Sequence, residues 1–281
     1  MTELYAWCTE TLRDHSLYAL EVFSKCFEDR LAKILASRLC LTHKALPILK
    51  ALGRTALALH DIGKAHSEYQ RLMRAKGYCI NPRRKCSNCK YAPTYPFHEV
   101  ISAYVFWQVY LELRRHLLAS ELEYEVLDSG DLAMNLGKMF TLAIIQHHQA
   151  MRAVSEITSR QPPQVKKFGK WSLRDALSLL EGLLEKSLEP LSPNIASSLA
   201  RDIKTSLPIQ YASWGEIVSS LKTALLAGLL DPRLKLYSIL SGPLYICDNL
   251  SAGKHRPKAP PRRIIEEAVK SYSCLASFAE T

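Results

Sequence analysis

One short stretch of the sequence combines side chains that could hold a metal ion with one that could hold a phosphate. It runs from Leu59 to Lys64 and reads LHDIGK. A neutral imidazole and a carboxylate both bind divalent ions, and together they suit first-row transition metals. Because neighbouring side chains on a helix point about 100° apart, His60 and Asp61 can flank one ion only in a concave pocket between helices. Lys64 follows on the same helix face, where its ammonium could hold a phosphate.

Other potential ligands occur at or near the ends of apolar segments. His147 and His148 close the apolar segment that begins at Phe140, and Asp248 lies late in another. A buried carboxylate needs a partner, and a metal ion is one of the few that suffice. Any one of these side chains alone would be an ordinary core or surface residue, so it is their combination that favours a metal site. The set to consider beside the motif is His15, His98, Glu99, His147, His148, Asp248 and Asn249.

In this order and spacing the residues resemble the HD nucleases of type I CRISPR interference. More narrowly, they resemble the stand-alone archaeal form of these nucleases, in which the HD domain is encoded apart from its helicase. The resemblance extends from His15 to Asp248, whereas the His-Asp pair alone would indicate only the wider HD superfamily. It implies an all-helical fold, two metal ions and a single-stranded DNA substrate exposed in an R-loop. It also implies a separate helicase subunit and the CRISPR effector complex as partners.

Position by position, the resemblance implies two groups of ligands that share Asp61. The first is His15, His60, Asp61 and Asp248, and the second is Asp61, His98, His147 and His148. Asp61 and Lys64 are then the catalytic pair, with Lys64 matching the lysine of the family motif. His43 competes with His15 for the first group, and family position favours His15. The chain departs from the family at Gln149, where a glycine often follows the paired histidines, and at Tyr69, where the aromatic residue after the lysine motif differs. Neither position is a ligand. Gln149 leaves open the geometry of the turn after the paired histidines.

Such a site would hydrolyse a phosphodiester without a nucleophilic side chain. One ion lowers the pKa of a bound water, and the other stabilises the scissile phosphate and the leaving oxygen. Histidines outnumber carboxylates among the ligands, which favours Mn, Fe, Co or Ni over Mg or Ca.

A second group of potential ligands is formed by Cys79, Cys86 and Cys89. Cys86 and Cys89 have the two-residue spacing of a zinc knuckle, and Cys79 lies in the same polar segment. We expect a structural zinc there, with exposed or disulfide-linked thiols as the alternative; the fourth ligand stays open among Cys40, His43 and His66. The five remaining cysteines lie singly among apolar residues and are interpreted as reduced core residues; they are Cys8, Cys26, Cys40, Cys247 and Cys274.

The formal net charge of +10 is concentrated in segments that contain no acidic residue. Segments 71–90, 157–174 and 252–263 hold seven, five and five of the 37 Lys and Arg residues. This distribution predicts a nucleic-acid surface, with solvated loops as the alternative. The expected contacts combine charge with an aromatic ring suited to unpaired bases; they are Arg83, Arg84, Lys85, Lys166, Lys167, Lys170 and Trp171.

The elements that must position these residues are helices almost throughout. Apolar residues at three- and four-residue spacing predict helices over 12–35, 46–62, 100–122, 132–148, 173–188, 195–205, 214–230, 234–250 and 264–278. Pro193, after Ser192, suits the first position of a helix. We expect one all-α HD-superfamily bundle over 1–281, with a basic Cys-containing insertion at 76–96, a basic-aromatic loop at 152–171 and a basic loop at 252–263.

Several classes of protein are excluded or disfavoured. None of the Gly-Lys pairs continues as a P-loop, because they are followed by Ala, Met, Trp and His, so these residues contain no ATP-driven motor. No apolar run is long enough for a membrane span and no signal peptide is visible, so we expect a cytoplasmic protein that does not bind membranes. The leading hypothesis is a metal-dependent nuclease that cuts single-stranded DNA in CRISPR interference. The alternatives are an HD phosphohydrolase acting on nucleotides or cyclic dinucleotides, and a non-catalytic nucleic-acid-binding adaptor.

Overall fold

The structure, a computed structural model, describes residues 3–7, 10–75, 97–119, 130–147, 176–207, 212–226, 232–254 and 263–279. Within these ranges it contains α-helices, short 3-10 helices and one isolated bridge between Tyr5 and Thr11, and it contains no β-strand. The prediction of an all-α fold is therefore confirmed.

The helices follow the predicted apolar periodicity closely, including a helix that begins at Pro193. Their bounds are α1 Leu12–Cys26, α2 Glu28–Arg38, η1 His43–Ala45, α3 Leu46–Leu59, η2 Ile62–Ala65, α4 Ser67–Ala75, α5 His98–Ala119, α7 Gly130–Gln146, α10 Leu177–Ser187, α11 Pro193–Ser206, α12 Trp214–Leu226, η5 Pro232–Leu236, α13 Tyr237–Lys254, α14 Arg263–Ser271, η6 Ser273–Leu275 and α15 Ala276–Ala279.

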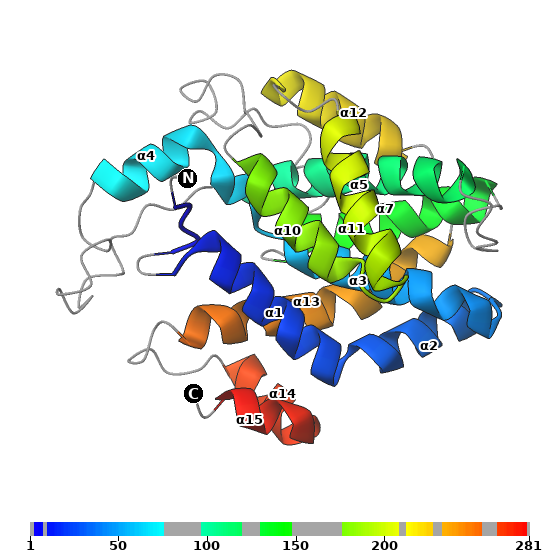
Figure 1. The fold of residues 1–281 in the computed structure, drawn as a ribbon. Coiled ribbons are helices and arrows are strands. Elements are labelled where there is room, and N and C mark those ends of the chain that lie inside the picture. The colour runs from blue at the N-terminus through cyan, green and yellow to red at the C-terminus, as the bar shows by residue number, and fades with distance from the viewer. Residues whose placement is uncertain are drawn as a thin grey trace.

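Helix α3 is the central element of the fold (Figure 1). It packs against α1, α2, α5 and α10, while α7 and α13 also reach it. Its side chains are buried on several faces, from Ile48 through Leu59. Because α3 is surrounded in this way, whatever residue ends it lies inside the protein, and that residue is His60.

Two predicted helices are interrupted within their apolar pattern. The helix expected over 12–35 is divided at Phe27, whose φ of −126° lies outside the helical range. Phe27 and Leu31 are both buried, so the apolar spacing continues across the turn and conceals it, while α2 turns to pack on α3. The helix expected over 46–62 ends at Leu59, and a 3-10 turn, η2, follows Asp61.

The sequence pattern also missed one helix and merged others. Helix α4, Ser67–Ala75, was not predicted. The helix expected over 264–278 is divided into α14, η6 and α15. These short elements are amphipathic pieces whose ends depend on what they pack against, so a single periodic pattern does not delimit them.

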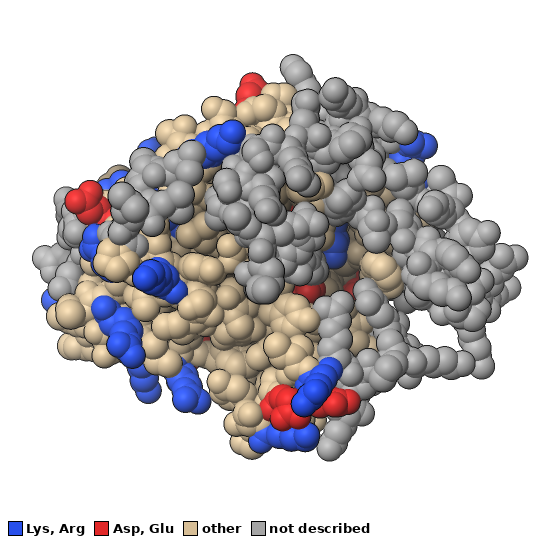
Figure 2. All heavy atoms as spheres, turned by 180° about the vertical axis from the view of Figure 1, so that it is seen from behind, with Lys and Arg blue, Asp and Glu red and all other residues tan. Residues whose placement is uncertain are grey.

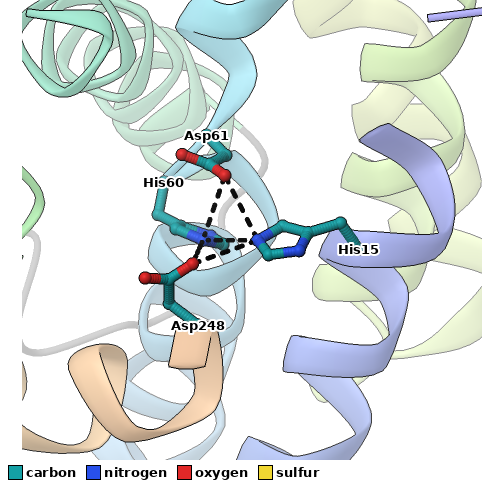
Figure 3. A group of neighbouring side chains, drawn as sticks. All are labelled: His15, His60, Asp61 and Asp248. Carbon is teal, nitrogen blue, oxygen red and sulfur yellow. Dashed lines mark hydrogen bonds and ion pairs between the residues drawn. The ribbon is translucent and has the colours of Figure 1, made fainter. Parts of the chain in front are cut away.

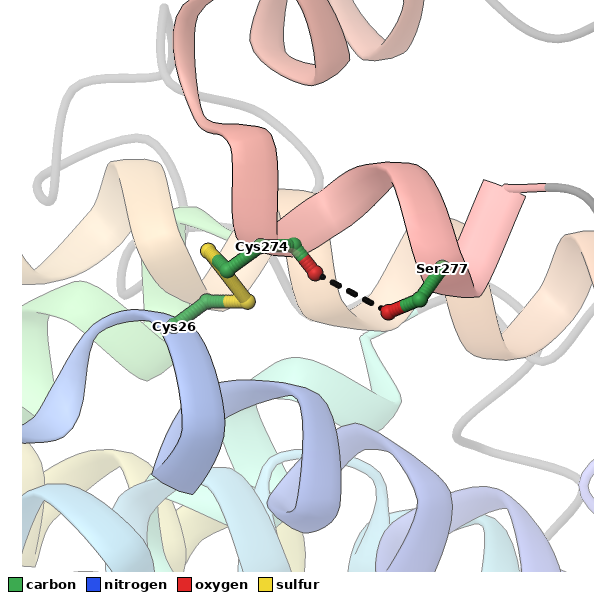
Figure 4. The surroundings of a disulfide bond; sticks show 3 residues. All are labelled: Cys26, Cys274 and Ser277. Atoms are coloured by element: carbon green, nitrogen blue, oxygen red, sulfur yellow. Dashed lines mark hydrogen bonds between the residues drawn. A yellow bond between two sulfur atoms is a disulfide. The ribbon is translucent and has the colours of Figure 1, made fainter.

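The interpretation of Cys26 and Cys274 as reduced core cysteines is wrong, because the structure joins them in a disulfide (Figure 4). Their Cα atoms are 5.6 Å apart although 248 residues separate them in sequence. The bond ties η6 to the end of α1, and the aromatic rings of Tyr272 and Phe278 pack on α1 and the turn after it. Of the others, Cys247 is a free buried thiol, as expected, whereas Cys40 is exposed and is not a core residue.

Much of the predicted basic surface lies outside the described residues. This applies to segment 76–96, to segment 152–171 and to most of segment 252–263. The individual predictions concerned are His148, Cys79, Cys86, Cys89, Arg83, Arg84, Lys85, Lys166, Lys167, Lys170 and Trp171. Among the helices that the structure describes, none combines the length and the apolar character needed to cross a membrane.

Candidate metal centre

Five helices bring their potential ligands to one buried point. His15 lies on α1 and Asp248 on α13, while His60 and Asp61 occupy the junction between α3 and η2. His98 is the first residue of α5, and His147 directly follows α7. The side chains of His15, His60 and Asp248 approach Asp61 from three separate helices (Figure 3). Helix ends therefore supply most of the site, since a side chain there can reach past the helix into the space between its neighbours.

The first group of side chains is His15, His60, Asp61 and Asp248. The Nε2 atom of His15 lies 3.2 Å from Oδ2 of Asp61 and 3.2 Å from Oδ1 of Asp248. It lies 3.3 Å from Nε2 of His60, which is itself 3.5 Å from the same oxygen of Asp248 (Figure 3). One ligand atom from each residue thus lies within 4.8 Å of all the others, which is compact enough to surround a single divalent ion.

The second group is Asp61, His98 and His147, and it uses the other oxygen of Asp61. Oδ1 lies 3.0 Å from Nε2 of His98 and 3.9 Å from Nε2 of His147. Asp61 therefore directs one oxygen at each group, as a ligand that bridges two ions would. His148, the remaining residue predicted for this group, lies outside the described residues.

The outer nitrogen of each imidazole faces an acceptor. Nδ1 of His60 lies 2.6 Å from the carbonyl of Leu57, and Nδ1 of His147 lies 2.6 Å from the carbonyl of Ile144. A carbonyl can only accept, so each Nδ1 carries the hydrogen and each Nε2 presents a lone pair. His15 and His98 have carboxylates in the same place, from Glu10 at 2.9 Å and Glu99 at 3.5 Å.

The donor set therefore fits a divalent transition metal. Lone pairs on the Nε2 atoms of His60 and His147 lie close to carboxylate oxygens, and positive charge from a metal ion or from protons relieves this repulsion. His60 and Asp61 are 0% exposed and His147 is 1% exposed, so water does not screen this repulsion. Imidazole nitrogens together with carboxylate oxygens suit Mn, Fe, Co or Ni.

The pKa shifts of His15, His98 and Asp61 also indicate that positive charge stabilises this cluster. Burial lowers the pKa of His15, but the carboxylates of Glu10, Asp248 and Asp61 reverse this and hold it well above its usual value. Burial also lowers the pKa of His98, but the hydrogen bond and the charge of Asp61 outweigh burial and raise it. Burial would raise the pKa of Asp61, yet Lys64 and the surrounding imidazoles hold it well below the usual range. Without a metal, protonation of His15 and His98 is therefore favoured.

Lys64 is part of this charge balance, because its ammonium pairs with Asp61. Its Nζ lies 2.5 Å from Oδ2 of Asp61. Burial lowers the pKa of Lys64, but the charge of Asp61 outweighs burial and raises it. The backbone of η2 holds the lysine in place, because Lys64 N donates to the carbonyl of Asp61 and Gln70 donates to the carbonyl of Lys64. The role of Lys64 as a phosphate ligand stays a prediction, and in the structure its ammonium pairs with the carboxylate of Asp61.

The other predicted or competing residues lie apart from the two groups. His43 is exposed on η1, so His15 is the histidine at the first group. Asn249 follows Asp248, but its amide donates to the carbonyl of Tyr245 on its own helix. His66 is buried, and its proposed cysteine partners Cys79, Cys86 and Cys89 lie outside the described residues.

Glu10 is a residue of the site that sequence reasoning missed. It is 1% exposed, and its carboxylate accepts hydrogen bonds from His15 and from Ser251. The only local signal is its place just before a helix start, where Thr11 caps α1 by accepting from the backbone of Asp14. That pattern locates the helix but says nothing about where Glu10 points.

Two of three comparisons with known proteins found a match. The sequence model of the family described as "Cas3, HD domain" matches residues 6–229. Among solved structures, the CRISPR-associated Cas3 HD domain protein from Methanocaldococcus jannaschii aligns over 88% of this chain and 100% of its own length, with 17% identity and a TM-score of 0.42. No curated protein matches the sequence.

Proposed function

The chain belongs to the Cas3 HD-domain family, and from this premise we propose that it is a metal-dependent nuclease that cleaves single-stranded DNA in CRISPR interference. Family membership itself makes it a CRISPR-associated HD-domain protein. The proposal adds the nuclease activity, the substrate and a separate helicase as partner. It also adds that the buried histidines and aspartates are the ligands.

The observation that carries the proposal is the convergence of two ligand groups on the two oxygens of Asp61. His15, His60 and Asp248 would hold one divalent ion with Asp61, and His98 and His147 would hold a second. Ions in such a site activate water and stabilise charge on a phosphate. The protein's own task is to aim Nε2 of each imidazole inward, and an acceptor behind Nδ1 orients the rings of His15, His60 and His147 in this way.

Lys64 would orient the substrate next to this centre. Its side chain is 13% exposed, so it borders the buried ligands on one side and solvent on the other. Binding of cations by Asp61 would weaken the hold of that carboxylate on the ammonium. The ammonium would then be able to contact a phosphate oxygen, as the motif predicts.

The proposed substrate and partner rest on the net positive charge of the chain and on the absence of a P-loop from its sequence. A net charge of +10, gathered in three acid-free segments, favours a polyanion over a small nucleotide. Strand separation by an ATP-driven motor has to come from outside these 281 residues, because they contain no P-loop. A separate helicase that delivers single-stranded DNA accounts for both observations.

The proposal is tested by stripping the purified protein with a chelator, adding Mn and supplying single-stranded DNA, duplex DNA or a cyclic dinucleotide. We expect metal-dependent cleavage of the single strand. Asp61→Ala should reduce cleavage at least about 10³-fold, because it removes a ligand from both groups and metal catalysis is worth several kcal/mol. Asp131→Ala, which removes an exposed carboxylate at the start of α7, is the matched control.

Circular dichroism of both variants checks that the helices remain. Cleavage of the cyclic dinucleotide but not of DNA would assign the chain to the phosphohydrolases. Metal binding without turnover on any substrate would favour the adaptor. Wild-type cleavage by Asp61→Ala would remove the assignment of the metal centre.

A further inference from the structure

Glu10 occupies the position behind His15 that backbone carbonyls occupy behind two other histidines of the site. Oε1 of Glu10 lies 2.9 Å from Nδ1 of His15, and both side chains are almost completely buried. Nε2 of the same ring faces Asp61 and Asp248. Glu10, His15 and the ligand cluster thus form one line, in which the imidazole lies between a carboxylate and the point where an ion would bind.

His15 needs such a partner because its own helix does not orient it. His60 and His147 each donate to a carbonyl three residues earlier in their own chain segment. Their ring positions are therefore fixed locally by the ends of α3 and α7. His15 lies inside α1, where the preceding carbonyls are already engaged in the helix. Its ring is held by a side chain from outside the helix.

Glu10 is itself held by the fold from several directions. The turn that contains it closes on itself, since the backbone amide of Ala6 donates to the carbonyl of Glu10. Gln70 holds this turn through hydrogen bonds to both backbone groups of Tyr5. Ser251 donates to the Glu10 carboxylate and also lies 3.0 Å from the carbonyl of His15. The serine is one turn beyond Asp248 on α13, so one hydroxyl links Glu10 to two of the helices that carry ligands.

We propose that Glu10 is a positioning residue of the metal centre, which orients His15 toward the ion and strengthens it as a ligand. The inference rests on the proposed metal-dependent function. A carboxylate behind a metal-binding histidine fixes the tautomer and raises the basicity of the inner nitrogen, and removing it typically lowers metal affinity about 10–100-fold. A neutral carbonyl orients a ring but contributes no full charge, so we expect His15 to depend on its partner more than His60 does.

The test is a Co²⁺ titration of the chelator-stripped full chain, followed by calorimetry and by visible absorption. Glu10→Gln keeps the size of the side chain and one acceptor oxygen but removes the charge. We expect it to weaken Co²⁺ binding about 10–100-fold and to change the ligand-field absorption. Glu3→Gln is the matched control, because Glu3 belongs to the same N-terminal segment and its carboxylate is exposed, accepting a hydrogen bond from Tyr5.

A double-mutant cycle separates positioning from a merely structural role. If Glu10 acts through His15, Glu10→Gln should have no further effect on Co²⁺ affinity in a His15→Ala background. Equal weakening in both backgrounds would overturn the inference. Wild-type protein that binds no Co²⁺ would refute the proposed function itself, whereas wild-type-like binding by Glu10→Gln would refute only this inference.

Ser251→Ala provides a second route if Glu10→Gln does not fold. It removes the hydroxyl between Glu10 and α13 and leaves both ligands in place. Weaker Co²⁺ binding by this variant supports the positioning role. Unchanged binding, together with an unfolded Glu10 variant, would assign Glu10 to folding instead.

Discussion

Asp61 gives each of its two carboxylate oxygens a different set of neighbours. Oδ2 faces His15 and Lys64, and Oδ1 faces His98. This division is the basis for proposing a centre for two ions and not for one. His15 and His60 approach Oδ2, whereas His98 and His147 approach Oδ1, so the two groups should be separable by substitution.

His98→Ala is expected to remove one ion and leave the other. Metal analysis of dialysed protein should fall from about two ions per chain to about one, since His98 belongs only to the second group. His15→Ala is the counterpart for the first group and should also leave about one. The histidine exposed on η1 offers a control, because His43→Ala should change nothing. Loss of all metal from the His98 variant, or one ion in the wild type, would contradict the two-ion centre.

The raised pKa values of His15 and His98 predict how pH affects the metal-free protein. A histidine whose pKa is raised by folding stabilises the protein fully below its unfolded value of about 6.5, and this contribution is lost as pH rises through the folded value. The melting temperature of chelator-stripped protein should therefore fall as pH increases above about 6.5. Added Mn should oppose the fall, since metal binding displaces these protons.

The double variant His15→Gln with His98→Gln serves as the control for this pH dependence. It should show a flatter dependence of melting temperature on pH over the same range, because the two titrating rings are gone. Metal-free wild-type protein that becomes more stable as pH rises would show that protons do not occupy the ligand cluster.

At the scale of elements, the contact between η2 and α5 is the tightest constraint on the site. Gly63 lies in η2, and a Cβ atom there would overlap the backbone carbonyl of His98. The amide of Gly63 also donates to the hydroxyl of Ser102 on α5. The motif glycine therefore lets the turn that follows Asp61 rest directly on the helix that begins with His98, so that both ligands stay in register.

Gly63→Ala should separate these two elements. Overpacking of this kind typically destabilises by about 1–3 kcal/mol, and here it should also weaken metal binding, because Asp61 and His98 would move apart. Gly242→Ala in α13 is the matched control, since nothing lies within 4 Å of its added Cβ, and it should stabilise the helix slightly. Thermal melts and Co²⁺ titration measure the two effects. Normal metal binding by Gly63→Ala would show that this contact does not hold the ligands in place.

At the scale of the whole molecule, the distribution of positive charge is the property that bears on binding of a nucleic-acid substrate. Several Lys and Arg side chains project from the described part of the face in Figure 2, while acidic side chains gather mainly in one mixed group at its lower edge. The three acid-free basic segments lie largely outside the described residues. Their contribution to binding is therefore best measured in solution.

Affinity for a single-stranded oligonucleotide should fall steeply with salt, with a log-log slope of about −0.7 per phosphate contacted. Charge reversal to Glu at Lys166, Lys167 and Lys170 should weaken binding and flatten this slope while leaving the metal content unchanged. The same reversal at the exposed residues Lys33, Lys44 and Lys235 is the control of equal net charge. Fluorescence anisotropy at several salt concentrations distinguishes the two. A slope near zero for the wild type would favour a small nucleotide as substrate.

Local patterns in the sequence were sufficient to predict the helical fold and most of the candidate ligands. Apolar spacing repeats within each helix, so it indicates α3, α5 and α7 without knowledge of their neighbours. The motif from His60 to Lys64 is also local. His98 and Asp248 were singled out beside the motif, the resemblance in order and spacing assigned them to ligand groups, and the structure brings both of them to Asp61.

Tertiary structure alone decided the features that depend on distant parts of the chain. The break at Phe27 is invisible to periodicity because the residues on both sides stay buried. The disulfide between Cys26 and Cys274 joins residues 248 positions apart, and no local signal pairs two such cysteines. Glu10 became part of the site because a turn outside α1 directs its carboxylate at His15. Such contacts arise when helices pack, and a one-dimensional pattern does not contain the distances between them.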